Sequence, residues 1–188
     1  ISTVRVTNST NQWLKQARPC PSPNHDLRPA GTEIRLLVIH NLSLPPGVFG
    51  GPWIQDLFLT RLDPRRHPYF QEIAHLPVSA HVNIRRDGTL LQDVPLERRA
   101  WHAGVSCYRN QEKCNDFSIG IELEGCDETG FTDEQYEALV TATRCVQALY
   151  PAIKQDQIVG HSDIAPGRKT DPGPYFDWDR YRALLDDG

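Results

Sequence analysis

The sequence lacks the features of a membrane or nucleic-acid-binding protein. Among its 188 residues, no apolar run approaches the length of about 18 residues that a membrane-spanning helix needs. The formal net charge is −4, so the charge balance gives no indication of binding to nucleic acid or to an anionic lipid surface. We therefore expect neither a nucleic acid nor a membrane as a partner.

The start of the chain has no recognisable targeting segment. Residues 1–6 contain neither the basic leader nor the apolar segment of a secretory signal peptide. The chain also begins without methionine, which leaves a leader removed ahead of Ile1 as an open alternative. On this basis we expect a cytoplasmic protein, and we expect it to be a monomer.

Cysteine spacing gives no sign of a disulfide framework or of a cysteine-based metal site. The count is odd, and no pair has the C-x-x-C spacing, which favours free thiols in a reducing compartment. The alternative is that one thiol is a zinc ligand or a nucleophile, for which Cys107 and Cys114 are the candidates. The five cysteines are Cys20, Cys107, Cys114, Cys126 and Cys145.

Length and apolar patterning predict a single α/β domain. The chain is long enough to bury one substantial core and contains no repeats. Residues 1–30 are polar and include four prolines after position 18, so we expect an N-terminal arm, followed by the folded domain at 31–188. Apolar runs predict strands near 33–40, 78–84, 90–94, 118–125 and 157–161.

Turn and capping signals complete the predicted fold. Asp87-Gly88 is typical of a hairpin turn, whereas Thr132 and Gln135 form the capping-box pattern of a long amphipathic helix that Pro151 ends. Further helices are expected at 54–59, near 70–75 and at 178–185. Because hairpin and helix-linked connections both occur, we predict a central mixed sheet flanked by helices.

Two predicted strands end in histidine. His40 follows the apolar run 34–39, and His161 follows Ile158-Val159. Prolines and glycines after His161 predict an irregular loop, which would bring Lys169 and Asp171 back toward the strand ends. Two histidines and one aspartate suit a catalytic zinc site, which uses three protein ligands and leaves one position open. The alternative is that each histidine is an ordinary half-buried polar residue.

Five segments of the chain carry a family resemblance. They are 38–47 (VIHNLSLPPG), 78–81 (VSAH) with 86–88 (RDG), 99–106 (RAWHAGVS), 114–125 (CNDFSIGIELEG) and 161–174 (HSDIAPGRKTDPGP). Through them the chain resembles the zinc-dependent N-acetylmuramoyl-L-alanine amidases, which share a fold with phage T7 lysozyme and the peptidoglycan recognition proteins. It is most similar to the cytoplasmic branch that cleaves 1,6-anhydro-N-acetylmuramyl-L-alanine during peptidoglycan recycling.

The resemblance implies a metal site, catalytic groups and a substrate. It implies one Zn²⁺ per chain bound by His40, His161 and Asp171, with Glu122 as the catalytic carboxylate and Lys169 as an electrophilic helper. The implied substrate is a 1,6-anhydromuropeptide. Phage-type relatives carry a tyrosine where this chain has Ala80, so Glu122 would have to supply the proton chemistry. The substrate-contact candidates are Asn41, Trp101, His102, Arg109 and Lys113.

Several alternatives remain beside this interpretation. Glu122 could be a solvated residue on the outer face of its strand, and Lys169 a surface lysine. Gly120 shares the face of Glu122, and we expect it to leave room for metal or substrate. Asp163 could replace Asp171 as ligand or hold the loop by turn hydrogen bonds. His81 and His102 rank below the chosen ligands. At the level of function, a peptidoglycan-binding module without activity and a cysteine hydrolase are the alternatives.

Overall fold

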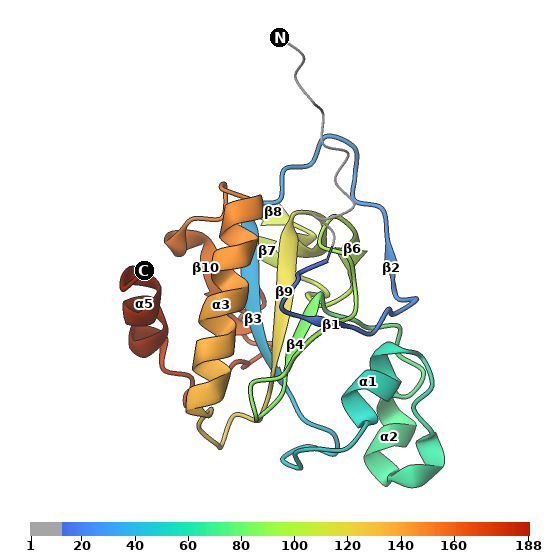
Figure 1. Ribbon diagram of the computed structural model, residues 1–188. Helices are drawn as coiled ribbons and strands as arrows, with labels where there is room; N and C mark the ends of the chain where they lie inside the picture. Colours follow the sequence, from blue (N-terminus) through green and yellow to red (C-terminus); the bar gives the residue numbers. More distant parts are fainter. Residues whose placement is uncertain (1–12) are drawn as a thin grey trace.

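A six-stranded mixed sheet forms the centre of the computed structural model, which describes residues 13–188 (Figure 1). The strand order is β1-β5-β4-β9-β3-β10, and β4 and β5 form the antiparallel pair while the other neighbours run parallel. This arrangement confirms the predicted α/β class. The strands are β1 (Arg18–Pro19), β3 (Leu36–Leu42), β4 (Val82–Ile84), β5 (Leu90–Gln92), β9 (Ser118–Glu124) and β10 (Ile158–Gly160).

One face of the sheet packs against two helices, α3 (Asp133–Leu149) and α5 (Trp178–Asp186) (Figure 1). Alternate strand residues such as Ile39 and Ile121 form the main core with apolar residues of both helices. The predicted capping box is present, because Thr132 Oγ1 accepts from Gln135 N at 3.1 Å and Gln135 Oε1 accepts from Thr132 N at 3.1 Å. These contacts fix where α3 begins.

The opposite face of the sheet is covered by segments without long helices. Leu36 and Val38 pack there against Phe117 and Ile164 in a second core cluster. As a result, all seven residues of β9 are buried, including both of its glutamates. The covering segments are β6 (Arg99–Ala100), β7 (Cys107–Tyr108), β8 (Gln111–Glu112), η2 (Cys114–Asp116) and α4 (His161–Ile164).

The helices α1 (Trp53–Phe58) and α2 (Pro68–Ile73) lie beside the sheet (Figure 1), and a third apolar cluster includes residues of both. Leu57 and Phe58 of α1 pack with Phe70 of α2 and with Ala80. The 3₁₀ turn η1 (Pro64–Arg66) links the two helices. Both helices were expected from the sequence, although each starts one or two residues earlier than predicted.

The segment predicted as an arm takes part in the sheet where the structure describes it. β1 pairs with β5 at the edge of the central sheet, and β2 (His25–Asp26) pairs with β6 in a separate two-stranded sheet. Leu14 of this segment is buried in the main core. The part of the predicted arm at residues 1–12 lies outside the described residues, and the boundary at residue 30 stays a prediction.

Two sequence expectations need correction. The strand expected at 78–84 begins only at Val82, after an irregular stretch. The strand expected at 157–161 ends at Gly160, and the loop expected after His161 begins with the short helix α4, which is followed by the irregular segment with Lys169 and Asp171. The 3₁₀ turn η3 (Gln155–Gln157) precedes β10, so this region is more regular than its prolines indicated.

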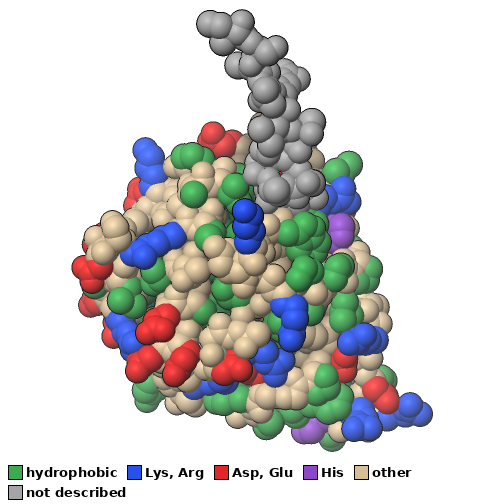
Figure 2. Space-filling view, in the orientation of Figure 1, with side chains coloured by type: hydrophobic (Ala, Val, Ile, Leu, Met, Phe, Trp, Pro, Cys, Tyr) green, Lys and Arg blue, Asp and Glu red, His purple; other side chains and the backbone are tan. Residues whose placement is uncertain are grey.

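Charges of both signs are scattered over the face of the molecule seen in Figure 2. This distribution agrees with the small net charge of −4. Of the helices in residues 13–188, none is both long and apolar enough to cross a membrane.

Candidate active site

The pairing of three parallel strands brings the site residues to one edge of the sheet. β3 runs parallel to β10, and Ile39 is opposite Gly160, so His40 and His161 follow at adjacent positions. β9 runs parallel to β3 on its other side and places Glu122 directly opposite His40. Because the carboxyl ends of parallel strands meet at the same edge, residues far apart in sequence converge there.

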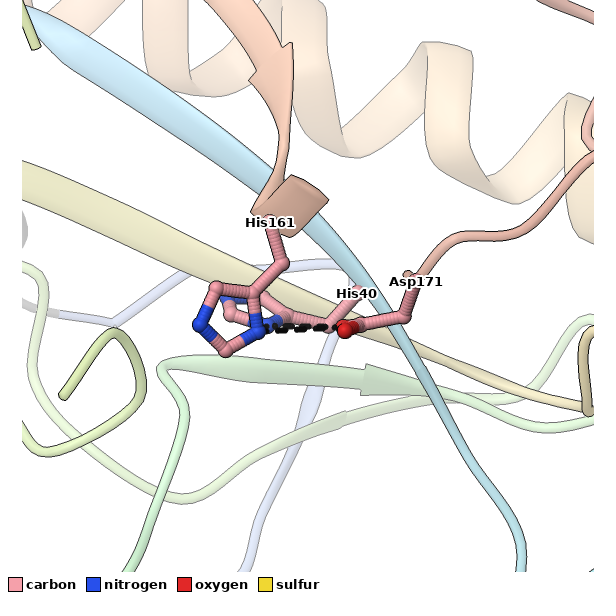
Figure 3. Close-up of side chains that lie close together, drawn as sticks. All are labelled: His40, His161 and Asp171. Carbon is pink, nitrogen blue, oxygen red and sulfur yellow. Dashed lines mark hydrogen bonds and ion pairs between the residues drawn. The ribbon is translucent and has the colours of Figure 1, made fainter. Parts of the chain in front are cut away.

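His40, His161 and Asp171 form a tight triangle at this edge (Figure 3). His40 Nδ1 lies 3.0 Å from His161 Nδ1, and Asp171 Oδ2 lies 3.2 Å from each of these nitrogens. Both histidines are buried, at 1% and 4% exposed. The triangle therefore brings together the three residues that the sequence suggested as metal ligands.

The donor set fits a zinc ion. Bonds of about 2.0–2.2 Å at tetrahedral angles place the donor atoms of a zinc site about 3.3–3.6 Å apart, close to the distances in this triangle. His161 Nε2 lies 2.9 Å from the carbonyl oxygen of Ala103, to which it donates, so Nδ1 is left with its lone pair toward the triangle. An outer partner of this kind is typical of metal-binding histidines.

Electrostatics at the triangle favour a neutral His40 and an ionised Asp171. Burial lowers the pKa of His40. Burial by itself would raise the pKa of Asp171, but hydrogen bonds with His161 and His40 outweigh that effect and leave the pKa below its ordinary value. A neutral imidazole and a carboxylate are the forms that bind metal ions.

Glu122 lies beside the triangle and is buried, which contradicts the alternative of a solvated outer-face residue. Its Oε1 is 3.9 Å from His40 Nδ1, and its Oε2 is buried without a hydrogen-bond partner. Burial, together with the negative charge of Asp171, raises the pKa of Glu122 well above its ordinary value, while Lys169 opposes this shift. A buried carboxyl group with a raised pKa is a candidate for general acid–base catalysis.

The loop that carries Lys169 and Asp171 is braced by hydrogen bonds. Asn41 Nδ2 donates to Asp127 Oδ1 at 2.8 Å and to the carbonyl oxygen of Pro172 at 3.0 Å. The other oxygen of Asp127 accepts from Thr170. Both N–H bonds of the Asn41 side chain are therefore engaged within the protein, although Asn41 was expected to contact substrate.

Asp163 supports the loop in the manner suggested as its alternative to metal binding. Its Oδ2 accepts from Gly160 N at 2.8 Å, within the turn that begins α4. The metal-ligand group of the described residues contains Asp171 and not Asp163. His81 is likewise outside this group, because its Nδ1 accepts from Gly120 N and its Nε2 donates to the carbonyl of Arg98.

His102 packs directly against the triangle. Its Nδ1 lies 2.8 Å from His40 Nε2, and the two rings meet edge to face with centroids 5.0 Å apart. Burial, followed by the neighbouring histidines, lowers the pKa of His102 well below its ordinary value. Gly120 provides space for this ring, because a Cβ atom there would lie 2.6 Å from His102 Cγ. The expectation that Gly120 leaves room for metal or substrate is therefore wrong.

A cavity of about 550 Å³ opens above the triangle and Glu122. Asn41, Trp101, His102 and Lys169 line it, but Arg109 and Lys113 do not. Arg109 instead pairs with Asp156 on the surface at 3.1 Å, and Lys113 lines a second cavity of about 440 Å³. Both basic residues were expected to contact substrate, and the structure places them away from the site cavity.

Sequence reasoning missed most of the cavity wall. Segment 44–52 contributes Leu44 and Pro46 to the wall, and segment 101–114 contributes Trp101 and His102. Much of the remaining wall comes from α1, from α2 with the residues after it, and from the residues that follow β9. Its members include Leu57, Phe58, Tyr69, Ile73, Leu76, Gly125, Cys126, Asp127 and Glu128. The sequence does not distinguish these residues as a cavity wall, because apolar residues in a helix are equally typical of an ordinary core.

The structure does not support Cys107 or Cys114 as a nucleophile. All five are free. Cys114 is fully buried, and burial raises the pKa of its thiol, which opposes formation of the reactive thiolate. Neither Cys107 nor Cys114 lines the cavity above the triangle.

Comparison with known proteins identifies the family. Residues 30–174 match the model of the N-acetylmuramoyl-L-alanine amidase family. The 1,6-anhydro-N-acetylmuramyl-L-alanine amidase AmpD of Enterobacter cloacae is 62% identical over 175 residues, which cover 93% of each chain. The crystal structure of a selenomethionine derivative of AmpD has a TM-score of 0.91 and 58% identity, covering 93% of this chain and 97% of that chain.

A more distant solved structure contains a bound substrate. It is the N-acetylmuramyl-L-alanine amidase AmiD of Escherichia coli in complex with anhydro-N-acetylmuramic acid-L-Ala-D-gamma-Glu-L-Lys, with a TM-score of 0.60, 29% identity, and coverage of 84% of this chain and 60% of that chain. The fold, the extent of the family match and the high identity to AmpD agree with one another. The chain belongs to the N-acetylmuramoyl-L-alanine amidase family and is a hydrolase of that class.

Proposed function

We propose that this enzyme hydrolyses the amide between 1,6-anhydro-N-acetylmuramic acid and the L-alanine of a stem peptide, using one zinc ion. The substrate class is supported by the names of the AmpD relatives and by the anhydromuramic ligand in the AmiD complex. Within this chain, the observation that carries the proposal is the buried triangle of His40, His161 and Asp171 with Glu122 beside it, at the base of a cavity.

The chemistry divides between the metal and the protein. A zinc ion in the triangle would act as a Lewis acid toward the amide carbonyl and would lower the pKa of a coordinated water toward about 7. His40, His161 and Asp171 would hold the ion. The lowered pKa values of His40 and Asp171 agree with this assignment, because a neutral imidazole and an ionised carboxylate are the forms that bind a metal ion.

Glu122 is the proton carrier in this proposal. Its free oxygen accepts the proton of the attacking water and then delivers it to the nitrogen of the leaving L-alanine. Burial without a hydrogen-bond partner suits this role, because the carboxyl group has no competing donor and its raised pKa favours a proton-bound state between the two transfers. A positioned acid–base group of this kind contributes about 10²–10⁴ in rate.

Lys169 supplies positive charge near the carbonyl oxygen of the amide that is cleaved. It lines the cavity and lies close enough to Glu122 and His40 to influence the pKa of both groups. In the tetrahedral intermediate, the former carbonyl oxygen carries negative charge. An ammonium group held in the cavity stabilises that charge more in the transition state than in the bound substrate.

The same proposal places the enzyme in cytoplasmic peptidoglycan recycling. Its implied substrate is a soluble wall fragment that has entered the cell, and the resemblance to the recycling branch supports this placement. A binding module without activity is disfavoured, because recognition alone has no use for a buried, unpaired carboxyl group beside three potential metal ligands.

Mass spectrometry of muropeptide digests tests the reaction. Purified anhydromuropeptide should yield free stem peptide and the anhydro sugar in the presence of zinc, and the reaction should stop after chelation and resume when zinc is restored. Treatment with a thiol-alkylating reagent serves as the control and should leave turnover intact. Cleavage at a different bond, or cleavage that survives complete removal of zinc, would contradict the proposal.

A further inference from the structure

One short segment, 101–103, supplies outer hydrogen-bond partners to both histidines of the triangle. The carbonyl oxygen of Ala103 accepts from His161 Nε2 at 2.9 Å, and the side chain of His102 meets His40 Nε2 at 2.8 Å. Asn115 holds this segment, because its Oδ1 accepts from the backbone N–H groups of His102 and Ala103, at 3.2 and 2.8 Å. The segment therefore contacts and orients the imidazole rings of both His40 and His161.

The contact between His40 and His102 differs from that of His161, because an imidazole can either donate or accept. His40 can present the lone pair of Nδ1 to the triangle only if its single proton is on Nε2. That proton then needs an acceptor, and the atom facing it is His102 Nδ1. His102 must in turn have its own proton on Nε2.

Ser118 completes the line of hydrogen bonds. Its Oγ lies 3.1 Å from His102 Nε2 and can accept a hydrogen bond from the N–H group there. Ser118 is fully buried at the start of β9, two residues before Gly120, whose missing side chain admits the ring. The order Ser118, His102, His40 thus fixes both the position of the His102 ring and the direction in which it can accept.

We propose that His102, anchored by Ser118, is a positioning residue that accepts from His40 Nε2 and thereby keeps His40 Nδ1 directed at His161 and Asp171. This inference rests on the proposed zinc site. It also replaces the expected role of His102 as a substrate contact, since both ring nitrogens are engaged within the protein. His102 does not act on substrate; its effect reaches the reaction through His40.

The test compares zinc affinities by competition with a chromogenic chelator. His102→Ala removes the acceptor and should weaken zinc binding about 10–100-fold, the usual cost of losing an outer partner. His102→Asn places an amide oxygen near the former Nδ1 and should restore much of that loss. Ser118→Ala leaves the ring but removes its anchor, and its affinity should fall between those of the wild type and His102→Ala.

His81→Asn is the matched control. His81 is more deeply buried than His102. It accepts from Gly120 N, donates to the carbonyl of Arg98 and lies 3.3 Å from Arg28 Nη2, and none of these contacts involves the triangle. Zinc affinity should be unchanged in this variant. Thermal unfolding of each zinc-free protein separates loss of the metal from loss of the fold.

A second measurement observes the hydrogen bond directly. In the zinc-loaded wild type, ¹⁵N-edited NMR should show a protected imidazole N–H resonance from His40 Nε2, which His102→Ala should lose. Absence of zinc from the wild type would refute the proposed zinc site. Equal affinity of wild type and His102→Ala, or an equal loss in His102→Asn and His102→Ala, would refute the role of His102 alone.

Discussion

A buried aspartate away from the active site should make the stability of this enzyme depend on pH. Asp93 is fully buried, and its carboxylate oxygens accept from the side-chain amides of Gln55, at 2.6 Å, and Asn83. Gln55 belongs to α1, which forms part of the cavity wall. Burial raises the pKa of Asp93 from 3.8 to about 7, although both hydrogen bonds oppose the shift.

The sign and size of the effect follow from this pKa. The folded protein retains the proton of Asp93 up to about pH 7, whereas the unfolded chain releases it near pH 3.8. Folding therefore becomes less favourable as pH rises from about 4 to 7 and stays so above that range. A difference of about 3 pKa units corresponds to about 4 kcal/mol, at 1.36 kcal/mol for each unit.

Asp93→Asn should remove this dependence. The amide of Asn83 can turn round, so that its unpaired Oδ1 accepts from the new side chain. Urea unfolding at intervals between pH 4 and pH 8 should show the variant gaining about 4 kcal/mol on the wild type across the range. Parallel stability curves for the two proteins would refute the assignment of a raised pKa to Asp93.

Four further predictions concern the active site. His40→Ala and His161→Ala should each lose bound zinc by elemental analysis, and zinc retained in both variants would exclude this ligand set. Glu122→Gln should keep zinc but lose about 10²–10⁴ in turnover, so near-normal turnover in the loaded variant would remove Glu122 from the mechanism. Lys169→Ala should lower kcat more than it raises KM while the fold is retained; an effect on KM alone would show that Lys169 only binds substrate. Finally, kcat/KM should be clearly higher for anhydromuropeptides than for the same peptides on ordinary reducing muramic acid, with little release from intact sacculi, and equal values would argue against a pocket shaped to the bicyclic sugar.

The sheet and the triangle could be predicted because their signals are local. An apolar run followed at once by His40 indicates a strand end, and the same pattern recurs at His161. Parallel pairing then brings these ends together without further information. Asp171 could be included among the predicted metal ligands because the irregular loop after His161 was expected to bring it back toward the strand ends. The family resemblance independently selected Asp171 over Asp163.

The surroundings of the triangle could not be predicted in this way, since they depend on which face of β9 is covered. Alternation placed Gly120 and Glu122 on one face but left open whether that face meets water. In the structure, His102 of segment 99–117 packs against Gly120 on that face, and Glu122 is buried beside His40. The same covering explains why Gly120 accommodates His102 rather than a ligand.

The hydrogen-bond partners of His161 and His40 outside the triangle show why the sequence does not predict these surroundings. His161 is oriented by a backbone carbonyl, that of Ala103, and any residue in that place would provide the same acceptor. No side-chain pattern can therefore mark it. His40 is oriented by the side chain of His102, which the sequence does show, but a histidine next to a tryptophan in a wall segment is equally typical of a substrate contact. Only the distances from its two nitrogens to His40 and Ser118 distinguish a group that positions another residue from one that meets substrate.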